Sequence, residues 1–295
     1  MRRMLLALAL ALAATPAHAA EPLQVVASFS ILGDMVEQLG AGHVTVTTLV
    51  GPDGDAHVFE PTPADAKALR GADLVVINGL GLEGWLPRLI QASGYRGPLV
   101  LASRGIHPRT MQEDGKTITD PHAWQDLRNG ETYAANITAA LAAADPADAA
   151  DFTAAGERYR ARLAGLDQEV RREIAAVPQA ARRVITSHDA FGYFAAAYGI
   201  DFIAPVGFST EAEPSAGDLA RIVRQMRATG VKALFLENMT DPRLIEQLAR
   251  EADATIGGNL YADALSPPTG PAPTYTAMFE SNVPKLVAAM SGQGS

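Results

Sequence analysis

The stretch Asp145–Val177 reads DPADAADFTAAGERYRARLAGLDQEVRREIAAV, and its apolar residues recur at steps of three or four. This period is typical of one face of an α-helix. Asp145 suits an N-cap, Pro146 suits the first turn, and Pro178 ends the run. We therefore expect one helix of about thirty residues, roughly 45 Å long. It is either a surface helix of one domain or a rigid spine between two lobes, and its length and central position favour the spine.

Strand-like runs alternate with helical runs on both sides of this stretch. Before it, we expect strands at Leu23–Ser28, Val44–Val50, Ala72–Ile77 and Pro98–Ala102, and helices at Ile31–Leu39, Thr62–Arg70, Trp85–Ala92 and Gly130–Ala143. After it, we expect strands at Arg183–Thr186, Phe202–Val206, Val231–Leu236 and Thr255–Gly258, and helices at Ala190–Tyr198, Ala216–Thr229, Pro242–Ala252 and Thr274–Met290. This alternation predicts an α/β fold with two lobes, each a parallel sheet flanked by helices. The expected boundaries are 20–143 for the first lobe, 144–178 for the spine and 179–295 for the second lobe.

The first nineteen residues have the pattern of a secretory signal peptide. Two arginines precede a short apolar run, and Ala17-His18-Ala19 matches a cleavage site. A membrane anchor is the alternative, but the apolar run is well below the roughly 20 residues that a span needs. The chain has no cysteine, so we expect neither disulfides nor a lipid on an N-terminal cysteine. The sequence thus predicts a soluble periplasmic protein without a lipid anchor.

The mature chain is acidic. Removing residues 1–19 takes away two arginines and no acid, which leaves 22 basic against 33 acidic residues and a net charge of −11. An acidic surface argues against nucleic acid and anionic membranes as partners, and it is compatible with attracting cations.

Three of the six histidines lie in short polar turns, one in each of three distant segments. His57 follows a turn with two aspartates. His122 lies between Asp120 and Asp126, whose carboxylates are able to hold its second ring nitrogen. His188 follows an expected strand, at the sheet edge where parallel α/β folds place their ligands. The intervals of 65 and 66 residues exclude helix-borne and finger-type zinc motifs. The pattern indicates a metal site assembled from distant parts of the chain.

A dinucleotide-binding fingerprint is formally present in Gly79-Leu-Gly-Leu-Glu-Gly84. It requires a carboxylate at the end of the next strand. The strand Pro98–Ala102 is followed by Ser103-Arg104 instead. We therefore expect the glycines to shape a turn.

Several stretches together resemble a known family. They are Val26–Met35 (VASFSILGDM), Gly54–Pro63 (GDAHVFEPTP), Ala72–Trp85 (ADLVVINGLGLEGW), Asp120–Trp124 (DPHAW), Ser187–Phe194 (SHDAFGYF) and Glu211–Ser215 (EAEPS). They are similar to the zinc- and manganese-binding receptors of bacterial ABC importers, the helix-spine group sometimes called adhesin-like. The resemblance runs in order through essentially the whole mature chain.

The resemblance implies a metal held between two α/β lobes that one long helix joins. Its ligand positions match His57, His122, His188 and Asp263, the last in a late loop where an aspartate capping the turn before Pro267 is the alternative. Two features depart from the family pattern. The segment Ile106–Thr119 lacks the His- and Asp-rich insertion of many zinc members, and residues 268–273 are rich in proline.

We therefore interpret the chain as a periplasmic receptor, not an enzyme, that binds Zn²⁺ and delivers it to a membrane permease. Three imidazoles and one carboxylate suit zinc. Mn²⁺ is the runner-up, with iron as a further alternative in the same family. Expected partners are the importer permease and a periplasmic metallochaperone, but no nucleic acid, and the protein is expected to be a monomer. A secreted zinc metallohydrolase with Glu60, Glu211 or Glu237 as its base is a rival from another class, and an adhesin is a third.

Overall fold

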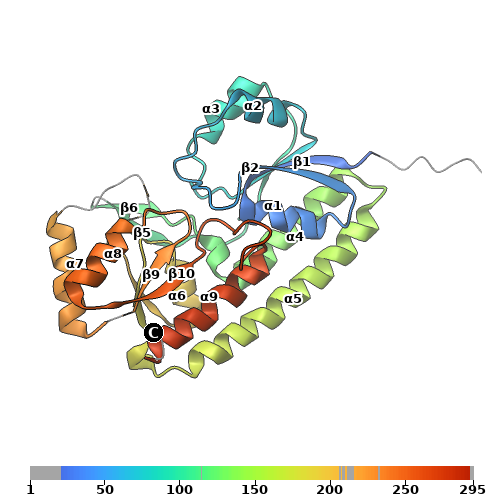
Figure 1. The fold of residues 1–295 in the computed structure, drawn as a ribbon. Coiled ribbons are helices and arrows are strands. Elements are labelled where there is room, and N and C mark those ends of the chain that lie inside the picture. The colour runs from blue at the N-terminus through green and yellow to red at the C-terminus, as the bar shows by residue number, and fades with distance from the viewer. Residues whose placement is uncertain are drawn as a thin grey trace, which may run out of the picture.

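A computed structural model describes residues 21–113, 115–205, 207, 210, 216–231 and 233–292. The expected signal peptide, Val206 and Glu211 lie outside these residues. In the described part of the chain, the strands form two four-stranded parallel sheets and one antiparallel hairpin. Helices cover the sheets, and one long helix joins the two lobes (Figure 1). The predicted α/β fold is confirmed.

The first lobe contains a sheet with the strand order β2-β1-β3-β4. Its strands are β1 (Leu23–Phe29), β2 (Val44–Val50), β3 (Leu74–Ile77) and β4 (Leu99–Leu101), and its helices are α1 (Ser30–Leu39), α2 (Pro63–Arg70), α3 (Leu86–Ser93) and α4 (Leu127–Ala144). The strand β3 is buried along its whole length, as expected for a parallel sheet covered on both faces. Gly79 and Gly81 adopt φ values of 81° and 89° in the turn after β3, so the glycines shape a turn as predicted.

The second lobe repeats this plan with the strand order β10-β9-β7-β8. Its strands are β7 (Arg183–Ile185), β8 (Asp201–Ile203), β9 (Ala233–Glu237) and β10 (Thr255–Leu260), and its helices are α6 (Gly192–Tyr198), α7 (Ala216–Thr229), α8 (Arg243–Ala252) and α9 (Tyr275–Met290). Consecutive side chains of β9 point to opposite faces of the sheet and pack into different hydrophobic clusters. Leu234 joins the cluster under α7 and α8, whereas Phe235 joins the main core on the opposite face.

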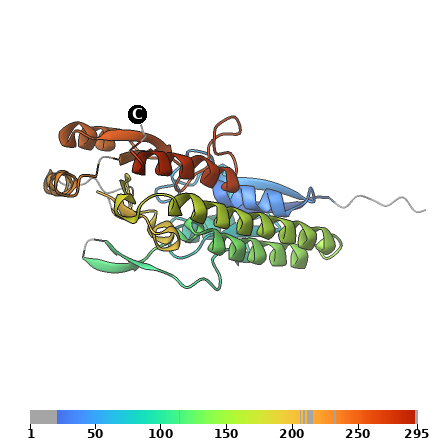
Figure 2. The ribbon, with the colours of Figure 1, turned by 90° about the horizontal axis from the view of Figure 1, so that it is seen from below.

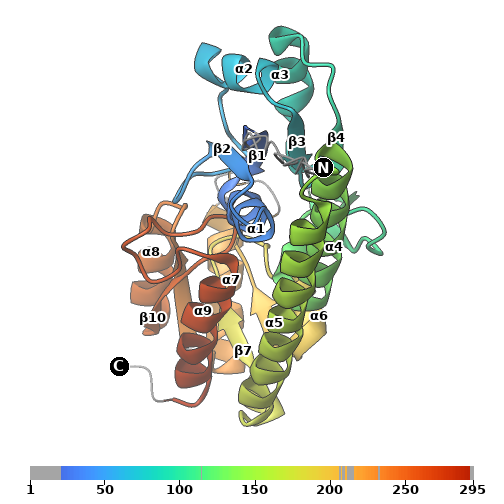
Figure 3. The ribbon, with the colours of Figure 1, turned by 90° about the vertical axis from the view of Figure 1, so that its right-hand side faces the viewer.

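The helix α5 (Ala149–Ala175) occupies the predicted spine position, and it lies beside α4 along one side of the molecule (Figure 3). The predicted N-cap is wrong. Asp145 caps the end of α4 and its side chain accepts a hydrogen bond from Ala147 N, while Asp148 precedes α5. The residue before a proline is disfavoured in the α region, so Asp145-Pro146 ends one helix instead of starting the next.

The structure contains a hairpin that the sequence analysis did not predict. Strands β5 (Thr110–Glu113) and β6 (Lys116–Thr119) pair antiparallel within Ile106–Thr119, where no strand was expected, and they extend from the body of the molecule (Figure 2). A short 3₁₀ turn, η1 (Ala123–Gln125), follows β6. The main hydrophobic core runs without a break from β1 to α9 and therefore crosses from one lobe to the other.

Candidate metal centre

His57 lies in the loop after β2, and its side chain is 3% exposed. Two contacts hold this loop. The backbone N–H of His57 donates to Asp55 Oδ1 at 2.8 Å, and Trp85 Nε1 donates to the carbonyl of Ala56 at 2.9 Å. The two residues that precede His57 are thus held in place next to the imidazole.

His122 is fully buried between β6 and η1. Its Nδ1 lies 2.8 Å from Asp120 Oδ1, which also accepts the backbone N–H of His122 at 3.0 Å. A carboxylate that accepts from Nδ1 leaves the lone pair on Nε2. Of the two aspartates expected to orient this ring, Asp120 does so. Asp126 instead caps α4 by accepting from Arg128 N.

His188 follows β7, at the carboxyl edge of the second sheet, as predicted. Its Nδ1 lies 2.6 Å from Glu237 Oε2, at the end of β9. The other oxygen of Glu237 accepts the backbone N–H groups of Ser187 and His188 at 2.7 and 3.1 Å. Glu237 therefore orients His188. The sequence analysis named Glu237 only as a conceivable base. Its place directly after an expected strand is a signal, but that this strand lies beside β7 is evident only in the structure.

Asp263 follows β10 and is fully buried. Its Oδ2 lies 3.0 Å from His188 Nε2, 3.1 Å from His57 Nε2 and 3.8 Å from His122 Nε2. The Nε2 atoms of His57 and His122 are 3.3 Å apart. The structure thus brings all four predicted site residues together, with one potential donor atom from each within 4.8 Å of the others.

These separations match those between the ligands of a tetrahedral zinc ion. Zinc–nitrogen bonds of about 2.0–2.1 Å place neighbouring ligand atoms about 3.3 Å apart. The other carboxylate oxygen of Asp263, Oδ1, is buried and has no hydrogen-bond partner among the described residues. A buried polar atom without a partner is costly, and a cation beside the carboxylate removes that cost. The donor set therefore fits a divalent transition metal.

The electrostatics of the site couple His188 to two carboxylates. Burial alone would lower the pKa of His188, but Glu237 and Asp263 raise it well above its ordinary value. Burial alone would raise the pKa of Asp263, but His188 and His122 hold it well below its ordinary value. In the metal-free protein, a proton on His188 thus occupies the position that a metal would take.

The loop that carries Asp263 is held by the segment that carries His122. Trp124 Nε1 and Gln125 Nε2 both donate to the carbonyl of Ala262, at 2.9 and 2.7 Å. The sequence motif around His122 contains Trp124, but its contact with the late loop has no signal in the sequence. These bonds join the segment that follows His122 to the backbone just before Asp263.

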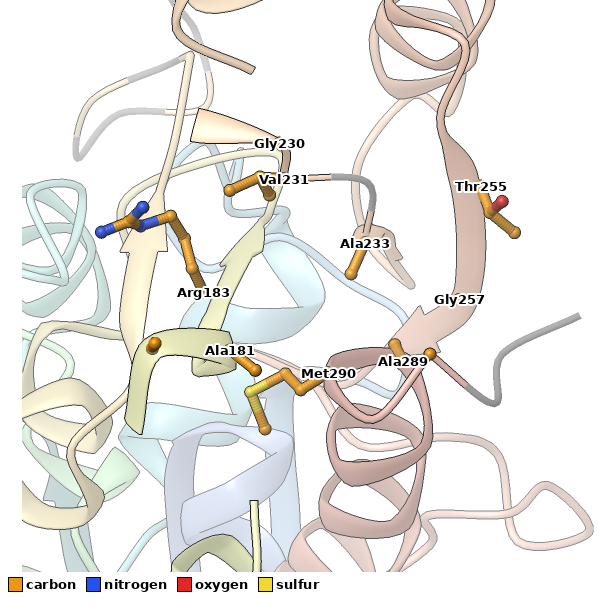
Figure 4. Close-up of a pocket in the computed structure, with 11 residues that line it drawn as sticks. Ala181, Arg183, Gly230, Val231, Ala233, Thr255, Gly257, Ala289 and Met290 are labelled. Carbon is orange, nitrogen blue, oxygen red and sulfur yellow. The ribbon is translucent and has the colours of Figure 1, made fainter. Parts of the chain in front are cut away.

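Two other features of the described chain do not extend this site. A cavity of about 370 Å³ lies at the amino ends of β7, β9 and β10, the opposite edge of the sheet from His188 (Figure 4). Among the described residues that line it, Arg183 is the one with a charged side chain, and its guanidinium pairs with Asp201 at 2.6 Å. On the surface, the ring nitrogens of His43 face Asp148 at 2.8 Å and Asp151 at 3.2 Å. Each ring nitrogen thus faces a different carboxylate at the start of α5.

A comparison with protein families identifies the chain. Residues 25–289 match the family described as "Zinc-uptake complex component A periplasmic". The chain belongs to this family. It is therefore a metal-binding receptor of an ABC importer, and the family consists of substrate-binding proteins of transporters, not of enzymes.

Relatives of this chain are named for the binding of different metals. The manganese-binding lipoprotein MntA of Halalkalibacterium halodurans is 32% identical over 92% of this chain and 89% of its own. The iron-binding protein YfeA of Yersinia pestis is 29% identical over 91% of this chain and 86% of its own. The solved periplasmic zinc-binding protein TroA from Treponema pallidum is 29% identical, with a TM-score of 0.86 over 92% of this chain and 99% of its own.

The comparisons also correct one expectation. The sequence analysis predicted a periplasmic protein without a lipid anchor, but the similar proteins from Halalkalibacterium, Bacillus and Streptococcus are named lipoproteins. The expectation rested on the lack of a cysteine in the chain. These relatives overturn it. Among the described helices, none has the length and apolar character to cross a membrane.

Proposed function

We propose that the cargo of this receptor is zinc, held by His57, His122, His188 and Asp263. The observation that carries the proposal is the convergence of three imidazole nitrogens and one carboxylate oxygen at separations suited to a tetrahedral ion. A shell of three nitrogens and one oxygen is typical of zinc. His57 and His122 come from the first lobe, and His188 and Asp263 from the second, so the ion is bound between the lobes.

Manganese is the second candidate, because several relatives are named manganese-binding. Manganese prefers more oxygen ligands than this set offers. Asp263 Oδ1 offers an additional oxygen, and a bidentate carboxylate would bring the shell to three nitrogens and two oxygens. Iron is a further candidate on the name of one relative. The nitrogen-rich set favours zinc over both.

A metallohydrolase is disfavoured by the roles of the candidate bases. Such an enzyme keeps an open coordination position for water and needs a general base beside it. Here four protein donors face one another, and both oxygens of Glu237 are engaged by the His188 segment. Glu60 is exposed, and Glu211 lies outside the described residues.

The site is closed to solvent, so delivery of the metal requires the ligands to separate. We infer that the permease of the importer drives this step by drawing the two lobes, residues 20–143 and 179–295, slightly apart around the spine at 144–178. A periplasmic metallochaperone that loads the site and a monomeric state belong to the same proposal.

The test is the zinc content and affinity of purified protein. We expect one zinc per chain, measured by elemental analysis and by competition with a chelator, and loss of tight binding in His122→Ala. His107→Ala is the matched control, because His107 is exposed and lies outside the cluster. Equal zinc binding by the two variants, or two equivalent tight sites in the wild type, would overturn the assignment.

A further inference from the structure

One face of α1 holds the segment that carries Asp263. Ser30 and Asp34 lie four residues apart on this helix and so project from the same side. Ser30 Oγ accepts the backbone N–H of Leu265 at 2.9 Å, and Asp34 Oδ2 accepts the backbone N–H of Tyr275 at 2.7 Å. Both bonds join the first lobe to the second, across more than 230 residues of chain. The loop between Tyr261 and Tyr275 is thus fastened to α1 at two points.

Tyr275 extends this connection to His122. Its ring is fully buried, and its hydroxyl donates to the carbonyl of Trp124. The Trp124 ring packs edge-on against the imidazole of His122, with centroids 5.4 Å apart, and its Nε1 donates to Ala262. Three hydrogen bonds, linked through the residues Tyr275 and Trp124, therefore connect Asp34 to the residue before Asp263.

The carboxylate of Asp34 lies at the amino end of α9. Tyr275 is the first residue of this helix, and the side chain of Thr274 caps only the N–H of Ala277. The first N–H groups of a helix have no partner within it, and they attract negative charge. Asp34 supplies that partner from the other lobe. A cavity of about 460 Å³ lies beside Asp34 and is also lined by Arg158, Tyr159 and Thr276. Close packing therefore does not hold the start of α9 on the side of this cavity.

The burial of Asp34 costs stability, since it raises the pKa of this carboxyl to about 6. A leucine of similar size would avoid this cost but would leave the N–H of Tyr275 without an acceptor. A buried ionisable group that is kept in spite of its cost is consistent with a role in fixing one arrangement of the chain.

We propose that Asp34 is a positioning residue of the metal centre, which holds the start of α9 so that Asp263 meets the three imidazoles. This inference rests on the proposed function, because it assigns Asp34 to the geometry of that site. A ligand displaced by a fraction of an ångström loses much of its contribution to the shell. Asp34 thus acts on the metal from the far side of the loop, through Tyr275 and Trp124.

The experiment compares Asp34→Leu, Asp34→Asn and Val36→Ala with the wild type. Val36 is buried on the same helix and contacts neither the loop nor the metal ligands through a hydrogen bond, so its truncation controls for a general loss of stability. The readouts are the rate of zinc release to an excess of chelator and the visible absorption spectrum of the cobalt-substituted protein. Cobalt bands report the geometry of the ligands, and a merely structural role would leave them unchanged.

We expect Asp34→Leu to release zinc about tenfold faster and to shift the cobalt bands, as for the loss of a residue that orients metal ligands. Asp34→Asn keeps an oxygen that accepts from Tyr275 and should stay within about twofold of the wild type. Tyr275→Phe, which breaks the next bond of the path while keeping the ring, should resemble Asp34→Leu and decides the matter if the leucine variant does not fold.

Unchanged zinc release and cobalt bands in Asp34→Leu or Tyr275→Phe, or equal effects in Val36→Ala, would overturn the inference while the proposed function stands. A wild-type protein that binds neither zinc nor cobalt at this site would instead overturn the proposed function, and the inference with it.

Discussion

Three imidazoles and one carboxylate face one another in the site. Two further carboxylates contact two of the rings, those of His122 and His188, at Nδ1, the nitrogen that points away from the other donors. Asp120 accepts from Nδ1 of His122, and Glu237 lies against Nδ1 of His188. Asp120 fixes the tautomer of His122 in which Nε2 carries the lone pair. Glu237 holds the His188 segment through its backbone N–H groups and places a negative charge beside Nδ1. At the scale of single residues, the choice of metal therefore depends on which donor atom each position presents, and His188 is the most informative of them.

The first prediction concerns the balance between zinc and manganese. His188→Glu replaces one nitrogen with an oxygen and makes the shell harder, so the ratio of zinc to manganese affinity should become narrower. It should not invert, because zinc lies above manganese in the Irving–Williams order. His188→Ala should weaken zinc binding strongly. Competitive binding of zinc and manganese to the wild type and the two variants measures the ratio of affinities. A ratio that His188→Glu leaves unchanged would show that His188 does not bind the metal.

The second prediction is the pH dependence of binding. The raised pKa of His188 in the metal-free protein means that its proton stabilises that state at low pH, and that this contribution is lost as the pH rises through the raised pKa. Metal must displace the proton, so zinc affinity should rise with pH and fall steeply from pH 8 to pH 5. Chelator competition across this range, with proton release followed by calorimetry, checks it. Affinity that is flat between pH 7 and pH 5 would contradict the assignment.

At the scale of elements, α5 shows what a sequence period can and cannot predict. Its apolar stripe predicted the helix because residues such as Phe152, Leu163 and Ile174 face the core at helical spacing, and all three are fully buried. Its start was predicted wrongly because Asp145-Pro146 suits the end of one helix as well as the beginning of another. The hairpin β5–β6 was missed because four-residue strands with mostly exposed side chains carry no core periodicity.

The third prediction follows from the buried stripe of α5. Leu163→Ala should lower the free energy of unfolding by about 2–5 kcal/mol, because the removed side chain leaves a cavity in a core shared by both lobes. Gln168→Ala, at an exposed position of the same helix, should change it by no more than about 0.5 kcal/mol. Denaturant unfolding of the metal-free proteins gives both values. A similar loss of unfolding free energy in the two variants would mean that the face of α5 with Leu163 does not stabilise the core.

At the scale of the whole molecule, one continuous core and a long helix join the two lobes. Hydrogen bonds such as those of Asp34 and Trp124 cross between them close to the site. The sequence predicted the two lobes from the repeated alternation of strands and helices. The fourth proposed ligand, Asp263, was assigned only through a family resemblance, because nothing in its local sequence distinguishes it from an aspartate that caps a turn. The partner of His188, Glu237, is 49 residues away in sequence and becomes evident only when β7 and β9 lie side by side.

The fourth prediction is that metal binding changes the overall shape little. A continuous helix resists the wide hinge motion that two or three flexible crossovers permit, and the shared core would have to open for the lobes to move far apart. Small-angle scattering profiles of metal-free and zinc-loaded protein should therefore nearly coincide. Profiles that differ as widely as those of a receptor that closes like a clamshell would show that α5 is not a rigid spine.

The central claim is that four residues from two lobes close a single metal site. Its most direct test is a crystal structure of the zinc-loaded protein with anomalous data collected on both sides of the zinc absorption edge. We predict one zinc peak per chain, with Nε2 of His57, His122 and His188 and a carboxylate oxygen of Asp263 at about 2.0–2.1 Å and no water among the ligands. A peak elsewhere, or a shell that lacks any of these four residues, would contradict the account.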